Sequence, residues 1–395
     1  MTPAARVQAA IDVLDAMLAG MAAEQALTRW ARRSRFAGSK DRAAVRDHVF
    51  DAWRCRRSLA ALGGAESGRG LMLGLLRRSG TDPDTVFGAG PYAPLALDAA
   101  ETAAGGPATG LAERLDMPDW LWPRFEASLG AAAPDAAASL QHRSGTHLRV
   151  NPGKGTLDAA CESLARDGVD CMPHPASATA LQVTSGSRRI RQSAAYLEGL
   201  VELQDAASQA LVDALPLTDG MRVLDFCAGG GGKSLAMAAR ARIEVFAHDA
   251  DPGRMRDLGP RAARAGVTVI ELASADLDRA GPFDLVLCDV PCSGSGSWRR
   301  DPEGKWRLSE AHLSVLTGIQ DAILRQAATL TAPAGYLAYA TCSVLTEENE
   351  SRIAGFLAAH PGWSCTFQRR WPVEEGTDGF FTAHLTREAT RRYTT

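Results

Sequence analysis

The sequence predicts a doubly wound α/β domain over residues 206–395. Three observations predict this fold class. Strand-like and helical segments alternate throughout the region, as they do in mostly parallel sheets. A glycine-rich loop, Asp225–Ser234, follows the first strand-like segment and opens a helix. A buried strand-like run, Phe283–Leu287, leads to Asp289, and Pro291 then ends the strand because it has no N–H to donate.

The residues before this domain form two further predicted parts. Val7, Ile11 and Leu14 recur at helical spacing, and helical patterns continue to about residue 130. From about residue 146 the order changes to strand, helix and strand, which indicates a small α/β subdomain. We therefore predict a helical domain over 1–130, a small α/β subdomain with its connection over 131–205, and the doubly wound domain over 206–395.

The strands of the last domain are expected in mostly apolar segments that are separated by helical stretches. They are Met221–Cys227, Ile243–Asp249, Val267–Ala273, Phe283–Asp289 and Gly335–Thr341. Gly379–Arg387 also has β character but is followed by no crossover helix, so we expect it to add an antiparallel edge strand.

The basic residues are almost all arginines, and a dense stretch runs from Arg29 to Arg46 with Trp30 and Phe36 interleaved. Arginine binds phosphate bidentately and stacks on bases, so such a stretch can bind nucleic acid. A charged helix surface above two core aromatics explains the same residues equally well. The net charge of −3 does not favour a nucleic-acid partner, so composition leaves RNA open.

Composition also limits the class of protein. At 395 residues the chain is longer than a domain with a single hydrophobic core usually is, so we expect more than one domain. The chain has no continuous apolar segment typical of a signal peptide and no run of about 18 apolar residues, so we expect no membrane span. The eight cysteines include no CxxC pair, which argues against a disulfide framework or a zinc site. We expect a cytoplasmic monomer without a metal.

Three classes of ligand are known to bind glycine-rich loops of this kind, and the sequence distinguishes between them. A P-loop ending at Lys233 and Ser234 would need glycine where Cys227 stands, so a nucleoside triphosphate is disfavoured. A dinucleotide pattern starting at Gly229 would need glycine at Ser234, and it fails too. S-adenosylmethionine remains, because its methionine carboxylate can lie at the helix N-terminus beside Lys233.

Acidic residues at the ends of successive strands favour the same donor. Asp249 follows the glycines by about twenty residues, where a carboxylate can bind ribose hydroxyls. Asp276 suits the adenine edge, and Asp289 follows the fourth strand, where carboxylates attract the sulfonium. Each of these residues alone could merely cap a helix. Their combination with the glycine loop is typical of S-adenosylmethionine binding.

A second thiol follows the fifth strand, in Thr341-Cys342-Ser343. A helix is expected to begin shortly afterwards, with Thr346 as N-cap and Glu347 and Glu348 in its first turn. If the fourth and fifth strands are neighbours, Cys292 and Cys342 emerge at one edge of the sheet. A helix N-terminus lowers the pKa of a thiol, and the thiolate is the nucleophilic form.

Two thiols beside a methyl donor suggest methylation of cytosine at C5. Cytosine C5 is a poor nucleophile until a thiolate adds to C6. A second group then helps to expel the thiol, and Asp289 can hydrogen-bond N3 of the adduct. The target base must be single-stranded or extruded. Two buried, inert cysteines remain a fair explanation of either residue taken alone.

At this point the sequence resembles the RsmB/NSUN family of RNA cytosine-5 methyltransferases. The resemblance rests on DFCAGGGGKS, AHDADPGRM, FDLVLCDVPCSGSGSWRRDP, GYLAYATCSVLTEENE, QDAASQ and GFFTAHLTR. HLRVNP resembles the small RNA-contacting subdomain of that family, and the N-terminal helices more weakly resemble its NusB-like domain. The resemblance implies a Rossmann-like class I methyltransferase domain. Gly229 and Gly230 depart from the usual Ala-Pro of the family loop, which puts donor affinity in question.

The resemblance also implies roles for individual residues. It implies that Cys342 is the nucleophile, that Cys292 assists product release and that Asp289 acts in catalysis. It implies donor contacts by Cys227, Ala228, Gly229, Gly230, Gly231, Gly232, Lys233, Asp249, Asp276 and Asp289.

The expected function is therefore S-adenosylmethionine-dependent methylation of cytosine C5 in structured RNA, with ribosomal RNA favoured. The alternatives are methylation of transfer RNA, or a non-catalytic RNA-binding or ribosome-assembly factor on the same fold.

Overall fold

The computed structural model describes residues 1–373 and 376–387, and the chain forms two compact units. The helical unit comprises Met1–Arg143 together with Trp298–Leu308, and the α/β unit comprises Ser144–Ser297 and the chain from Ser309 onward. Within the described ranges, none of the helices has the length and apolar character that crossing a membrane requires. The three-part division of the chain stays a prediction.

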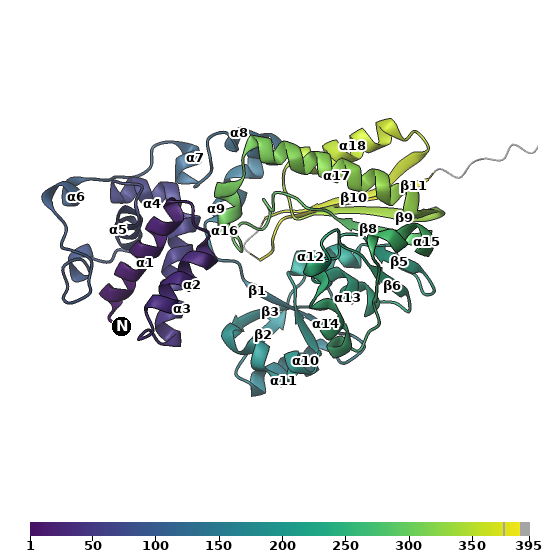
Figure 1. The fold of residues 1–395 in the computed structure, drawn as a ribbon, viewed down its shortest axis with the longest axis horizontal. Coiled ribbons are helices and arrows are strands. Elements are labelled where there is room, and N and C mark those ends of the chain that lie inside the picture. The colour runs from purple at the N-terminus through teal and green to yellow at the C-terminus, as the bar shows by residue number, and fades with distance from the viewer. Residues whose placement is uncertain (374–375, 388–395) are drawn as a thin grey trace, which may run out of the picture. The chain divides into compact units, whose positions relative to one another are not determined.

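Over its described residues the helical unit is built from ten α-helices, and the first five of them pack around one apolar core (Figure 1). Its helices are α1 (Pro3–Leu18), α2 (Ala23–Arg33), α3 (Ser39–Arg54), α4 (Arg56–Gly63), α5 (Gly68–Arg78), α6 (Ala99–Ala103), α7 (Leu111–Arg114), α8 (Trp122–Leu129), α9 (Ala133–Leu140) and α16 (Pro302–Arg307). Helix α1 begins where the Thr2 side chain accepts a hydrogen bond from the Ala5 amide, and its apolar residues Ile11 and Leu14 are buried. The expected NusB-like character of this unit stays a prediction.

Helix α16 is distant in sequence from the rest of the helical unit. The indole Nε1 of Trp306 donates to the carbonyl of Trp53 at 2.8 Å, and Lys305 Nζ donates to the carbonyl of Arg54 at 3.2 Å. Lys305 is buried, and burial lowers its pKa to about 8. The segment that follows the Cys292 loop in sequence is therefore part of the core of the helical unit.

The α/β unit contains two sheets. The smaller sheet has the order β2-β3-β1-β4, and all its described pairs are antiparallel. Its elements are β1 (Thr146–Val150), α10 (Leu157–Arg166), β2 (Asp170–Pro173), β3 (Ala180–Ser185), α11 (Ala194–Leu197) and β4 (Val201–Leu203). Helix α10 covers it with buried Ala160 and Leu164, which join a core with Leu148 and Leu181.

The larger sheet has the order β10-β11-β9-β8-β5-β6-β7 over the described residues. Its strands are β5 (Arg222–Asp225), β6 (Glu244–Ala247), β7 (Ile270–Glu271), β8 (Phe283–Asp289), β9 (Thr331–Thr341), β10 (Trp363–Trp371) and β11 (Phe380–Arg387). The pairs from β7 through β9 are parallel, and β11 pairs antiparallel with both β9 and β10. The predicted mixed α/β fold with a mostly parallel sheet is confirmed.

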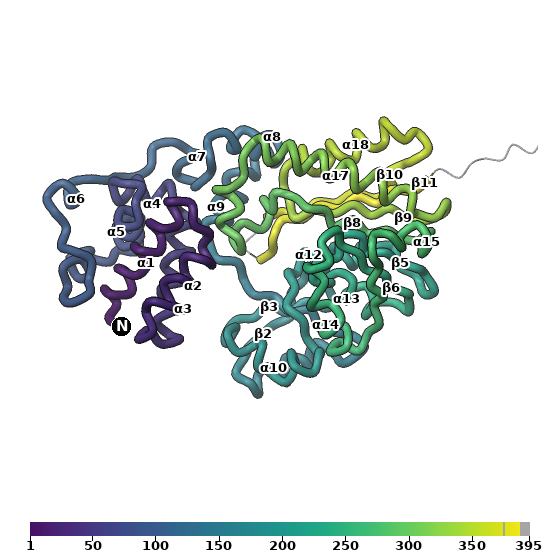
Figure 2. Tube along the Cα trace, viewed as in Figure 1, coloured from purple at the N-terminus to yellow at the C-terminus, as the bar shows by residue number. Residues whose placement is uncertain are grey.

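Helices cover both faces of this sheet (Figures 1 and 2). Apolar residues of α17 (Glu310–Leu330) and α18 (Glu350–Ala359) join one core cluster, and those of α12 (Ala206–Asp213) and α13 (Gly232–Ala238) join the other. The remaining helices are α14 (Leu258–Ala265) and α15 (Leu277–Ala280). Since both faces are covered, the central strands are continuously apolar rather than alternating.

Two details differ from the sequence-based expectation. Gly379–Arg387 does form an antiparallel strand, β11, but β10 occupies the sheet edge, so β11 lies between β10 and β9. Strand β10 is not recognisable from the sequence because charged Arg369 and Arg370 interrupt its apolar pattern, and its pairing with β11 is irregular after Cys365. The third strand is also shorter than expected, since only Ile270–Glu271 pair with β6.

Candidate active site

The first element of the site is the loop between β5 and α13. It turns sharply through Gly229 at φ +51° and Gly231 at φ +77°, which is the left-handed region that favours glycine. A β-carbon at Gly231 would lie 2.1 Å from Leu258 Cδ1, so a side chain at this position would displace Leu258 of α14. The glycines therefore allow the sharp turn that joins β5 to α13.

A cavity of about 560 Å³ lies at the carboxyl ends of β5, β8 and β9. This is the edge at which open α/β sheets bind ligands. The residues around it come from the glycine loop, from both cysteine loops and from the start of α12. They are Gln204, Ser208, Asp225, Cys227, Ala228, Gly229, Gly230, Gly232, Lys233, Arg254, Asp289, Val290, Pro291, Cys292 and Cys342.

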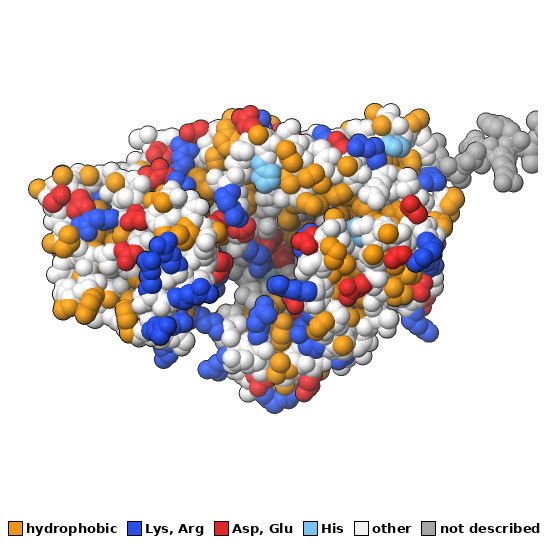
Figure 3. Space-filling model, viewed as in Figure 1, with side chains coloured by type: hydrophobic (Ala, Val, Ile, Leu, Met, Phe, Trp, Pro, Cys, Tyr) orange, Lys and Arg blue, Asp and Glu red, His pale blue; other side chains and the backbone are white. Residues whose placement is uncertain are grey.

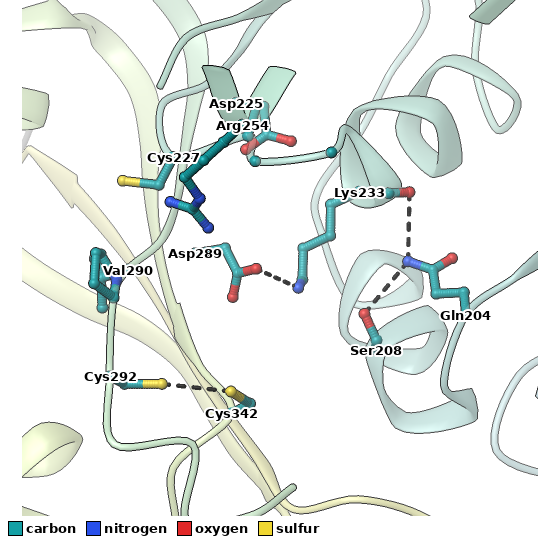
Figure 4. A pocket seen from close by; sticks show the side chains of 15 residues that line it. Gln204, Ser208, Asp225, Cys227, Lys233, Arg254, Asp289, Val290, Cys292 and Cys342 are labelled. Carbon is teal, nitrogen blue, oxygen red and sulfur yellow. Dashed lines mark hydrogen bonds and ion pairs between the residues drawn. The ribbon is translucent and has the colours of Figure 1, made fainter. Parts of the chain in front are cut away.

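The two predicted thiols meet in this cavity (Figure 4). Cys292 lies on the loop after β8 and Cys342 directly follows β9, and their sulfurs are 3.4 Å apart. Strands β8 and β9 pair in parallel, with Asp289 opposite Ala340. Parallel neighbours end at the same sheet edge, and this pairing brings together two residues that are distant in sequence.

The two sulfurs have opposite acidities. The hydrogen bond from Cys292 lowers the pKa of Cys342 below its ordinary value, and the Lys233 charge acts in the same direction. The same hydrogen bond, followed by burial and the charge of Glu348, raises the pKa of Cys292 well above its ordinary value. Burial also raises the pKa of the neighbouring Cys227. Among these three thiols Cys342 is the one poised to act as a thiolate.

A cation and a carboxylate face the thiols. Lys233 Nζ donates to Asp289 Oδ2 at 2.5 Å, and Figure 4 shows the pair above the two sulfurs. Burial alone would lower the pKa of Lys233, but the attraction of Asp289 outweighs it and holds that pKa above its ordinary value. Lys233 therefore stays a cation that can donate protons to a bound group.

Asp225 is a second carboxyl of the cavity, and it ends β5. Its Oδ2 accepts a 2.6 Å hydrogen bond from Ser234 Oγ, whereas its buried Oδ1 has no hydrogen-bond partner among the residues that the structure describes. Burial raises its pKa from 3.8 to about 7. A buried acceptor that lacks a partner is costly, so this oxygen is suited to receive a donor group from a bound ligand.

The remaining predicted acidic residues are placed differently. Asp249 is buried behind the loop, where its Oδ2 accepts hydrogen bonds from the Gly229 amide and from Arg254 Nη1, both at 2.9 Å. Asp276 lies outside the lining of the cavity and pairs with Arg279 at 2.7 Å. Gly231 also lies outside the lining.

Several residues around the cavity were not singled out as site residues in the sequence analysis. Gln204 Nε2 donates to Ser208 Oγ at 3.3 Å and to the Gly232 carbonyl at 3.4 Å, and Arg149 Nη1 also donates to that carbonyl at 2.8 Å. Arg254 projects into the cavity (Figure 4). Their sequence signal was their place in the motifs QDAASQ, DADPGRM and HLRVNP, because their contacts depend on tertiary folding.

The comparisons with known proteins agree with this geometry. Residues 212–386 match the family described as 16S rRNA methyltransferase RsmB/F, and residues 117–189 match the ferredoxin-like domain of RsmF/B-like methyltransferases. A crystal structure described as PH0851 superposes with a TM-score of 0.75 at 24% identity, covering 98% of this chain and 99% of that one. At this identity the superposition shows the fold alone.

Two curated relatives extend the match. "Probable ribosomal RNA small subunit methyltransferase B" of Synechocystis sp. is 31% identical over 262 residues, which cover 64% of this chain and 59% of the relative. "Ribosomal RNA small subunit methyltransferase B" of Yersinia pestis is 30% identical over 285 residues, which cover 68% of this chain and 66% of the relative. The matches thus span about two thirds or less of these relatives' lengths. On these motifs, matches and fold, the chain belongs to the RsmB/NSUN family of methyltransferases.

Proposed function

We propose that this protein is an S-adenosylmethionine-dependent RNA cytosine-5 methyltransferase that acts on ribosomal RNA. The observation that carries the proposal is the meeting of Cys292 and Cys342, 3.4 Å apart, in a cavity that also holds the Lys233–Asp289 pair. The curated relatives carry the names of ribosomal RNA small subunit methyltransferases, which supports the choice of RNA.

The residues of the cavity fit the methyl donor. The glycine loop offers open backbone at the N-terminus of α13, which suits the methionine carboxylate. Asp225 lines the same cavity, and its Oδ1, which no described residue hydrogen-bonds, suits a positively charged group such as the donor's ammonium. Among the residues expected to hold the donor, those that line the cavity are Cys227, Ala228, Gly229, Gly230, Gly232, Lys233 and Asp289. Donor contacts by Gly231, Asp249 and Asp276, which lie outside that lining, are part of the proposal as well. When bound, S-adenosylmethionine supplies the methyl group.

The chain's own residues then activate the base and release it. The Cys342 thiolate adds to C6 of cytosine, so an S–C6 bond forms and electron density moves toward C5 and N3. The proton held by the Lys233–Asp289 pair can be shared with N3 as charge develops there. Once C5 carries the methyl group, its proton is lost to solvent, the C5–H electrons form the C5=C6 double bond, and the S–C6 bond breaks with its electrons returning to the Cys342 sulfur. Cys292 lies against the departing sulfur and assists that release.

The helical part is proposed to contact the RNA. Phe36 is 76% exposed, and Figure 3 shows basic side chains gathered over α2 and α3. The exposed cations around Phe36 are Arg29, Arg32, Arg33, Arg35 and Lys40. Exposed arginines next to an exposed aromatic ring can hold phosphates and stack on a base.

The test is methylation of RNA from cells that lack the gene. Purified protein and labelled S-adenosylmethionine are incubated with ribosomal RNA or transfer RNA, and the product nucleoside is identified by mass spectrometry. We expect 5-methylcytosine in ribosomal RNA, at a position that bisulfite sequencing locates. Label in transfer RNA alone would favour the transfer-RNA alternative. RNA binding without donor binding or methylation would favour the non-catalytic alternative and refute the proposed function.

A further inference from the structure

A buried carboxylate links the two cysteine loops. Glu348 is 0% exposed and ends the short 3-10 turn Thr346–Glu348. The sequence pattern placed this residue in the first turn of a helix, but α18 begins only at Glu350, and the side chain of Glu348 turns inward instead. There it becomes an acceptor for donors from three different segments.

Two of these segments are the residues that follow the cysteines. Glu348 accepts hydrogen bonds from the Ser293 amide at 2.7 Å, from Ser293 Oγ at 2.5 Å and from Ser343 Oγ at 2.5 Å. Ser293 follows Cys292, and Ser343 follows Cys342. The Glu348 carboxylate therefore forms hydrogen bonds with the residue that follows each of the two cysteines.

The third segment is helix α17. Gln320 Nε2 donates to Glu348 Oε1 at 3.1 Å and to the carbonyl of Pro291 at 2.9 Å. Glu348 itself is held in place because Tyr339 Oη donates to its carbonyl at 2.6 Å. The carboxylate is thus a fixed point on which the loop after β8 and the loop after β9 both converge.

Burying the charged Glu348 carboxylate costs free energy unless hydrogen-bond donors surround it in good geometry. Neutral serine–serine contacts already join the loops, since Ser295 Oγ and Ser343 Oγ are 2.9 Å apart. A carboxylate draws its donors closer than a neutral acceptor does, so it holds both loops more tightly than those contacts alone.

We propose that Glu348 is a positioning residue whose carboxylate, held between Ser293 and Ser343, sets the spacing of Cys292 and Cys342 and thereby the release of the methylated product. This inference rests on the proposed function, because release is a step of that reaction. The electrostatics point the same way, since the Glu348 charge contributes to the raised pKa of Cys292. A thiol at position 292 can donate a hydrogen bond to the departing Cys342 sulfur.

The main test is Glu348→Gln, which keeps the side-chain length but replaces one acceptor oxygen by a donor. We expect single-turnover methyl transfer to stay within about threefold of the wild type, while multiple turnover falls about tenfold and a covalent protein–RNA adduct accumulates. The adduct is measured on denaturing gels. Glu347→Gln, one residue earlier in the same turn, is the matched control and should release product at the wild-type rate.

A second measurement is independent of activity. In a Cys161→Ser/Cys171→Ser background, the thiol-to-thiol cross-linker dibromobimane should join Cys292 to Cys342, and Cys292→Ala should abolish that product. The background is needed because the Cys161 and Cys171 sulfurs are also close, 2.8 Å apart. We expect Glu348→Gln to slow this cross-link several-fold, whether or not the RNA substrate has been identified correctly.

The outcomes separate the two proposals. If wild-type protein makes no 5-methylcytosine and Cys292→Ala traps no adduct, the proposed function fails, and the cross-link alone decides on Glu348. If Glu348→Gln cross-links and releases product as the wild type does, the positioning role is wrong. Equal losses of methyl transfer, release and thermal stability would also overturn it, because they indicate a merely structural residue. If Glu348→Gln does not fold, Ser293→Ala removes one of the same contacts and should slow release and cross-linking.

Discussion

Lys233 Nζ lies 2.5 Å from Asp289 Oδ2, although Lys233 belongs to the helix after β5 and Asp289 ends β8. The pair joins the glycine loop to the strand that leads to Cys292. Phe380 of β11 packs beside it, with its ring centroid 5.4 Å from Nζ. The proposed donor site and the pair of thiols therefore share one ion pair, so a substitution of Lys233 or Asp289 should affect both donor binding and the chemistry at the thiols.

Substitutions of the two cysteines should impair different steps of the reaction. Cys342→Ala removes the thiolate that attacks C6, so we expect methylation to fall at least about 1,000-fold with no covalent adduct. Cys292→Ala leaves the attack possible but impairs release, so a protein–RNA adduct should survive denaturing electrophoresis. Full activity of Cys342→Ala would refute its assignment as nucleophile, and absence of the adduct in Cys292→Ala would refute the release role.

Removal of the cation should impair the chemical step more than folding. Lys233→Met leaves the Asp289 carboxylate without its counter-charge and takes away the proton that the pair shares, so we expect the single-turnover rate to fall about 100-fold. The rate is measured by rapid quench with labelled donor, and the thermal midpoint reports folding. Lys233→Arg keeps the charge and serves as the comparison. Equal rates for the Met variant and the wild type would rule out a role for the pair.

Arg254 should compete with the methyl donor for Asp249. The Arg254 side chain is 54% exposed, and its guanidinium donates to the Asp249 oxygen that ribose hydroxyls would need. Arg254→Ala leaves only the Gly229 amide on that oxygen, so calorimetry should show donor binding about threefold to tenfold tighter. Arg256→Ala is the control and should bind as the wild type does. Weaker binding by Arg254→Ala would indicate instead that Arg254 itself contacts the donor.

Asp225 should make stability depend on pH. Its folded-state pKa of about 7 lies above the ordinary 3.8, so the folded protein binds this proton more tightly than the unfolded chain. The resulting stabilisation is complete below about pH 4 and is lost as the pH rises through about 7. Asp225→Asn removes the dependence, so it should be more stable than the wild type at pH 8, by on the order of 4 kcal/mol at most, and closer to it at pH 5.

Urea unfolding at the two pH values measures this difference directly. Ser234→Ala is the comparison, since it removes the hydrogen bond to Asp225 but keeps the carboxyl group. An equal effect of Asp225→Asn at both pH values would contradict the prediction.

The basic surface around Phe36 should bind RNA backbone. A triple Arg32→Ala/Arg33→Ala/Arg35→Ala variant should weaken RNA binding and reduce the slope of log affinity against log salt by about two to three. Fluorescence anisotropy at several salt concentrations measures both. Arg242→Ala, at a side chain that is 94% exposed and paired with Asp219, is the control. An unchanged salt slope in the triple variant would remove this surface from the RNA-binding site.

The alternation of helices and strands was predictable because both faces of the large sheet are covered, which gives its central strands continuous apolar runs. Strand β10 escaped prediction because it lies at the sheet edge, where charged residues such as Arg369 and Arg370 are tolerated. The sequence predicted that Cys292 and Cys342 would lie close together if the strands before them are neighbours, since neighbouring parallel strands end at one sheet edge. That these two strands, β8 and β9, are neighbours is known only from their pairing in the structure.

The sequence by itself determined which residues are candidates for chemistry, because strand-end motifs such as PCS, TCS and the glycine loop are local patterns. Only the tertiary structure decided which groups control them. Glu348 reaches Ser293 across 55 positions of sequence, and Lys233 reaches Asp289 across 56. A buried polar group must find its hydrogen-bond partners wherever the fold places them, and no local pattern records that choice.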